Sequence, residues 1–96
     1  MFGVKFHNGE IRENGTLLGK LRNDTIYDKS GITLGKTRND EIHDKSGITL
    51  GKVKDGYVYR SGVRLGRVSD YMIDDMQHEK DVNIVACYHF LVKKFL

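Results

Sequence analysis

The chain has no proline and no tryptophan, and Cys87 is its one cysteine. A single cysteine excludes a framework of disulfides within the chain, so we expect a cytoplasmic protein. Cys87 lies in an apolar run, where a buried and inert thiol is the expected state. That run, residues 84–92, is too short to span a bilayer, and no secretory signal pattern opens the sequence. We therefore expect no membrane span.

Motifs of catalysis are also lacking. The four histidines show no HxH or HExxH spacing, so we expect no metal site. Residues 31–37, GITLGKT, resemble a phosphate-binding loop, but only three residues separate their glycines, and Ser30 stands where the first glycine is required. No nucleophile with a histidine base can be singled out. We predict that the protein is not an enzyme and has no catalytic residue and no cofactor.

Glycine, by contrast, occurs eleven times, and most of it belongs to an internal repeat. The stretch DKSGITLGK stands at residues 28–36 and again at 44–52. It is part of a 16-residue unit, 22–37 and 38–53, whose two copies differ at Thr25/Glu41, Tyr27/His43 and Thr37/Val53. Diverged copies occupy residues 8–21 and 55–68, which makes four visible units. Half-units at 2–4, where FGV matches LGK, and at 70–74 indicate a fifth unit shared between the two ends.

Each unit predicts a β-hairpin, because an extended stretch around Ile26 is followed by the turn signal DKSG and by a second extended stretch. A three-residue loop with glycine in the left-handed region fits this turn. Positive φ is therefore expected at Gly31, Gly47 and Gly62.

The alternation of residues predicts which side chains point inward. Ile26, Ile32 and Leu34 share one face, whereas Tyr27 and Thr33 point to the other. Strict alternation breaks after the leucine, since Leu34 and Thr37 lie three apart and are both expected inside. We predict that a β-bulge restores the inward direction, and place it at Gly35, Gly51 and Gly66.

The tail lacks the repeat's glycines and is expected to be a helix over residues 80–96. One apolar stripe comprises Val82, Val85, Ala86, His89, Val92 and Leu96, and a second comprises Ile84, Tyr88, Leu91 and Phe95. We expect one stripe to cover an open end of the hairpin array and the other to meet a second copy of the chain. The predicted interface of this homo-oligomer is Tyr88, Leu91 and Phe95. A strand is the alternative for VNIVACYHF, against which its length argues.

One position of the repeat is always basic, and rotational repetition would arrange its members as a ring: Lys20, Lys36, Lys52 and Arg67. Such a ring can attract nucleic acid, another polyanion or an acidic partner. The alternative is that lysine protects strand edges and keeps the surface hydrated. We favour this alternative, because aromatic residues that stack on bases are not interleaved with the cations: Tyr57 and Tyr59 lie in a single unit.

The spelling I-x-D-x-x-G-x-x-L-G-K/R-V across residues 2–74 resembles that of the small bacterial β-flower proteins. The resemblance implies short hairpins that radiate around a four-fold or five-fold axis, and it carries over no catalytic residue. The fold expected is mainly β, a closed or radial array of four to five hairpins in residues 1–74, with a C-terminal helix in 75–96 packed on it or at an oligomer interface. Closure would pair residues 2–6 with 71–74.

We predict a non-catalytic interaction or assembly module. The first rival is a module that binds polyanions or glycans through the cation ring or through the outward Tyr27, His43 and Tyr59. The second rival is an enzyme whose site lies between subunits. The sequence does not name the partner.

Overall fold

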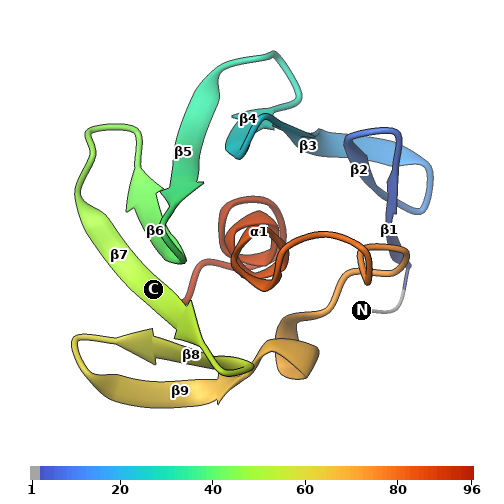
Figure 1. The fold of residues 1–96 in the computed structure, drawn as a ribbon. Helices are drawn as coiled ribbons and strands as arrows, with labels where there is room; N and C mark the ends of the chain where they lie inside the picture. Colours follow the sequence, from blue (N-terminus) through green and yellow to red (C-terminus); the bar gives the residue numbers. More distant parts are fainter. Residues whose placement is uncertain (1–2) are drawn as a thin grey trace.

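The computed structural model describes residues 3–96 as one curved sheet wrapped around a C-terminal helix (Figure 1). Every strand pairs antiparallel with the next strand along the chain. The strands are β1 (Val4–His7), β2 (Glu10–Glu13), β3 (Thr16–Arg22), β4 (Thr25–Asp28), β5 (Thr33–Arg38), β6 (Glu41–Asp44), β7 (Thr49–Lys54), β8 (Tyr57–Arg60) and β9 (Val63–Arg67). A 3₁₀ turn (Val68–Tyr71) leads to α1 (Asp81–Cys87), which continues as a π-helical turn (Tyr88–Val92). The protein is therefore mainly β with a C-terminal helix, as predicted.

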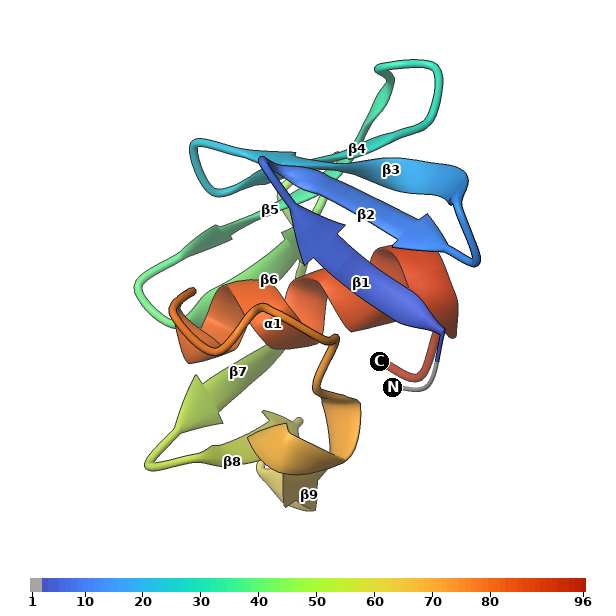
Figure 2. The ribbon, with the colours of Figure 1, turned by 90° about the vertical axis from the view of Figure 1, so that its right-hand side faces the viewer.

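The helix lies inside the curve of the sheet and does not cover an open end. Figure 2 shows β1 to β5 on one side of α1 and β7 to β9 on the other. The residues that α1 buries, from Val82 to Cys87, occupy its whole circumference. A helix that is apolar on most sides suits this enclosed position.

The chain returns to the first strand after β9. An isolated parallel bridge joins Lys5 to Asp74. The N–H of Phe6 donates to the carbonyl of Asp74 at 2.9 Å, and the N–H of Asp74 donates to the carbonyl of Val4 at 3.2 Å. The sheet itself ends at β1 and β9, which do not pair with each other. Of the predicted closing segment, Phe2 lies outside the described residues.

The turns at the inner ends of the hairpins contain two residues with positive φ. Asn23 and Asp24 have φ of 50° and 60°, and the repeated pair, Asn39 and Asp40, has 52° and 62°. Two successive left-handed residues define the type I′ turn, whose twist matches that of a hairpin. Asparagine and aspartate tolerate this region best among residues with a side chain.

The turns at the outer ends confirm the predicted glycine conformations, since φ is 86° at Gly31, 88° at Gly47 and 79° at Gly62. In the twin repeats, Asp28 Oδ1 accepts hydrogen bonds from the N–H groups of Ser30 and Ile32, at 2.8 and 3.0 Å. The three-residue loop holds for these two units. It is wrong for the first and last units, whose strands pair Glu13 with Thr16 and Arg60 with Val63 and so turn through two residues only.

The inward-facing residues form the core with α1. Ile11, Ile26, Ile42 and Val58 occupy equivalent places in four units and are fully buried. Ile32, predicted to be inside, is instead 61% exposed. The hairpin tips project past the helix (Figure 1), so a side chain at that point has no surface to pack against.

The bulges lie one residue before the glycines at which they were predicted. Ile26 pairs with Gly35 and Tyr27 pairs with Thr33, which leaves Leu34 as the extra residue. The same shift makes Leu18, Leu50 and Leu65 the bulged residues of the other units.

The glycines that follow these leucines serve a different purpose. A Cβ on Gly35 would lie 2.3 Å from Cζ of Phe90, and one on Gly19 would lie 2.5 Å from Cδ2 of Leu91. Glycine is required because the helix contacts the sheet backbone directly at these points.

The helix is shorter than predicted and ends at Val92. Lys93 has an extended backbone, and the last residues fold back over the helix. Nδ1 of His89 accepts hydrogen bonds from the N–H groups of Phe95 and Leu96, at 3.0 and 3.1 Å. These contacts replace the helical bonds that a continuation to residue 96 would make.

Both predicted apolar stripes pack within the domain. Tyr88, Leu91 and Phe95 are half-buried against the hairpins and the segment after β9. The Phe95 ring stacks on Tyr71 with centroids 4.3 Å apart. The interface was predicted because the second stripe was expected to be uncovered. In the structure the domain itself covers part of this stripe.

Candidate functional site

The side of the sheet that faces away from α1 is strongly basic. Directly paired residues of neighbouring strands share a face, so the pairing identifies this outer face. Its cations are Lys5, Arg12, Lys20, Arg22, Lys36, Arg38, Lys52, Lys54, Arg64 and Arg67. Within the described strands, the acidic residues of the same face are Glu10 and Glu41.

The predicted ring cations occupy equivalent positions on the outer face. Lys20, Lys36, Lys52 and Arg67 each stand beside an inward glycine of the repeat. Lys36, Lys52 and Arg67 are exposed, and Lys20 is half-buried.

Lys5 takes the same place in the first hairpin. It pairs with Arg12 as Lys20 pairs with Tyr27. The alignment of FGV with LGK is one residue out of register and hides this match, because Val4 corresponds to the glycine and Lys5 to the lysine. The apolar residue on each side of Lys5, Val4 and Phe6, was the available signal.

An aromatic ring lies directly across from each of the three repeat lysines. Tyr27 pairs with Lys20, His43 with Lys36 and Tyr59 with Lys52. The prediction that aromatic residues are not interleaved with the cations is therefore wrong. A regular spacing could have revealed the pairs, because Tyr27, His43 and Tyr59 recur every 16 residues, seven after each lysine.

Two hollows lie beside the lysine–aromatic pairs, toward the β9 end of the sheet. One, of about 300 Å³, is lined by Glu41, Lys52 and Tyr59 among others. The other, of about 500 Å³, is lined by Tyr57, Arg64 and Arg67 with residues of the following turn. The guanidinium carbon of Arg64 lies 4.1 Å from the centroid of the Tyr57 ring, which is a cation–π contact.

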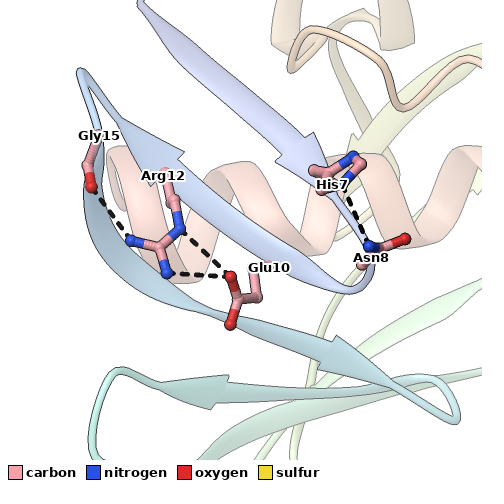
Figure 3. A network of polar contacts seen from close by, with 5 residues as sticks. All are labelled: His7, Asn8, Glu10, Arg12 and Gly15. Atoms are coloured by element: carbon pink, nitrogen blue, oxygen red, sulfur yellow. Dashed lines mark hydrogen bonds and ion pairs between the residues drawn. The ribbon is translucent and has the colours of Figure 1, made fainter.

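A third hollow, of about 650 Å³, lies over β1 and β2 and includes Lys5 and Asp74. Figure 3 shows its polar contacts. Arg12 donates to Oε1 of Glu10 through Nε and Nη2, at 3.2 and 3.0 Å, and through Nη1 to the carbonyl of Gly15 at 3.1 Å. Glu10 therefore offsets the charge of Arg12 on the first hairpin.

A separate polar cluster fixes the start of α1. Nδ2 of Asn83 donates to Oδ1 of Asp24 at 2.9 Å, and Nζ of Lys80 lies 3.1 Å from Oδ2. These bonds, first that from Asn83 and then that from Lys80, lower the pKa of Asp24. The cluster attaches the helix to one inner turn, so we assign it a structural role.

Residues 3–96 show little sign of a metal site, a reactive thiol or a membrane-spanning helix. No three His, Cys, Asp or Glu residues of this range are grouped to hold a metal ion. Burial, and then the charge of Glu79, raises the pKa of the Cys87 thiol, so it is a poor nucleophile. Over the same range, no helix combines the length and the apolar character that crossing a membrane requires.

The fold and the outer face together define a hairpin-repeat protein built around a central helix. A family model described as "5-fold beta-flower protein" matches residues 5–88. The chain belongs to this β-flower family. No curated protein and no solved structure matches the chain significantly.

Proposed function

We propose that this β-flower protein is a non-catalytic interaction module whose outer face binds polyanions. The observation that carries the proposal is the repeated pair of a lysine and an aromatic ring on successive hairpins, Lys20 with Tyr27, Lys36 with His43 and Lys52 with Tyr59. The alternative that lysines merely protect strand edges does not account for these positions, because β3, β5 and β7 are interior strands of the sheet.

Spacing strengthens the argument. Equivalent cations stand two strands apart, which is roughly 10 Å along a flat sheet. This is about the Debye length at 0.1 M salt, so the charges repel one another. A polyanion relieves that repulsion and releases its own condensed counterions on binding.

We also infer that the hairpin array is radially closed and that the protein is cytoplasmic. The bridge between Lys5 and Asp74 and the five-fold description of the family support closure. The free thiol of Cys87 supports the location. Self-association through Tyr88, Leu91 and Phe95 stays a prediction, and their packing within the domain does not favour it.

The test replaces three outer-face lysines at once, as Lys20→Gln/Lys36→Gln/Lys52→Gln. A matched control, Lys29→Gln/Lys45→Gln/Lys93→Gln, removes the same charge from exposed positions off this face. We expect the first variant to elute from immobilised heparin at much lower salt and to lose about three from the slope of log K against log salt. The control should lose little. No retention of the parent protein at low salt, or equal losses in both variants, would overturn the proposal.

A further inference from the structure

We propose that the polyanion is a single-stranded nucleic acid, with Lys20 and Lys52 on its phosphates and Tyr27 and Tyr59 stacked on its bases. This inference rests on the proposed function and specifies its ligand. Three features of the outer face lead to it.

The first feature is curvature. The sheet bends around a single helix, and the molecule measures only 36 × 27 × 20 Å (Figure 1). A DNA duplex has a persistence length of about 150 base pairs, so it stays straight over this distance and meets the curved face along one line. A flexible single strand can follow the face from one hairpin to the next.

The second feature is the distance within each pair. Directly opposed residues of an antiparallel pair have Cβ atoms about 5 Å apart. A lysine and a tyrosine at this separation match the phosphate and the base of one nucleotide. The pattern is that of single-strand binding sites in general, in which cations follow the backbone and aromatic rings take successive bases.

The third feature is the state of the rings. Tyr27 and Tyr59 are half-buried, so packing at the base of each ring limits its rotation before a ligand arrives. Tyr57 is a poorer platform, because Arg64 already lies 4.1 Å from its ring centroid. His43 replaces tyrosine in the middle pair, where it lies 3.5 Å from Glu41 and hydrogen-bonds Thr49 at 3.1 Å.

Positive charge attracts any polyanion, so it does not distinguish a nucleic acid from a sulfated glycan. The aromatic rings do, because they can stack on bases. A sulfated glycan offers anions without flat aromatic faces. Removing the rings while keeping the lysines should therefore affect a single-stranded nucleic acid and leave a sulfated glycan unaffected.

The experiment measures fluorescence anisotropy with a labelled oligothymidine of about 15 nucleotides, a duplex of the same length and a heparin oligosaccharide. Tyr27→Leu/Tyr59→Leu should weaken binding of the oligothymidine about tenfold and leave heparin binding and the salt slope unchanged. Tyr27→Phe/Tyr59→Phe keeps both rings and should bind like the parent.

A variant that is expected to bind more tightly tests the inference without the risk that lost binding reflects lost folding. His43→Tyr restores the third ring and should tighten oligothymidine binding severalfold while heparin binding stays constant. Equal effects on both ligands, or a duplex bound as tightly as the single strand, would overturn the inference and leave polyanion binding standing. If no probe binds the parent at low salt, both proposals fail together.

Discussion

The hydroxyl of Thr37 on β5 donates a hydrogen bond to Oδ1 of Asn83 on α1, at a place where both residues are buried. In the twin repeat the equivalent residue is Val53, also buried. This is the one inward difference between two units that are otherwise almost identical. The contact therefore distinguishes the two repeats, because Thr37 offers a hydroxyl to the start of the helix and Val53 has none.

Replacing Thr37 with valine should lower the free energy of unfolding by about 1 to 3 kcal/mol, because the buried Oδ1 of Asn83 loses its donor. The reciprocal change, Val53→Thr, buries a hydroxyl at a site 6% exposed and should cost a similar amount. Urea denaturation measures both. A cost below about 0.5 kcal/mol for Thr37→Val would show that the contact contributes little to stability.

Glycine can be required for space or for backbone conformation, and substitutions at Gly35 and Gly47 test the two requirements separately. Gly35→Ala places a Cβ 2.3 Å from Phe90 Cζ and 2.5 Å from the carbonyl oxygen of His43, so we expect a loss of about 2 kcal/mol or more. Gly47→Ala is the control, since φ is 88° but nothing lies within 4 Å of the added atom. Its cost should be about 1 kcal/mol. Thermal unfolding ranks them, and a larger loss at Gly47 would contradict the packing argument.

Much of the fold follows from local signals in the sequence. The turn residues predicted the hairpins, and the positive φ at Gly31 follows from the same residues. Repeat spacing placed Lys20, Lys36 and Lys52 in equivalent positions, which the pairing of strands bears out.

The features that the sequence did not predict depend on contacts between distant segments. The bulge falls at Leu34 and not at Gly35, and the glycine leaves room for Phe90, over fifty residues later. The end of the helix depends on His89, which captures the backbone of Phe95. Each lysine pairs with the aromatic ring of the next unit, so the pairs show in the recurrence across units and not within a single unit.

Charge on the outer face can be raised as well as lowered. Glu41 pairs with Lys52, whereas the twin repeat has Thr25 opposite Lys36. Glu41→Gln should tighten heparin binding a few-fold, since one charge about 5 Å away is worth about 1 kcal/mol in water. Glu13→Gln, at an exposed hairpin end, is the control. Equal effects of the two substitutions would show that only net charge matters.

The tail offers a test of self-association. Leu91 reaches the backbone at Gly19, and Phe95 stacks on Tyr71 with an interplanar angle of 8°. Leu91→Glu/Phe95→Glu should therefore destabilise the domain by about 3 kcal/mol or more, seen as loss of the β signal in circular dichroism. A parent that is oligomeric by light scattering, and a double variant that is a folded monomer, would instead establish the predicted interface.

The last prediction concerns acid stability. Nδ1 of His89 must offer a lone pair to the N–H groups of Phe95 and Leu96, and protonation there would break both bonds. Burial, and then the charge of Lys94, lowers the pKa of His89 in the folded state. The unfolded chain has the ordinary value of about 6.5 and so binds the proton more readily. Stability from this site is therefore complete above about pH 6.5 and is lost as the pH falls below it.

Urea denaturation at a series of pH values checks this dependence. His89→Gln removes the titration and should flatten the loss of stability below about pH 6.5, at the cost of a lower overall stability. His78→Gln, on the exposed segment before α1, should retain the full dependence. The lowered pKa of Asp24 acts in a separate window, below that carboxyl's ordinary value of about 3.9, so it does not obscure the comparison. If His89→Gln keeps the slope of the parent between pH 5 and 6.5, some other group controls it, and the hydrogen bonds to the tail are not its cause.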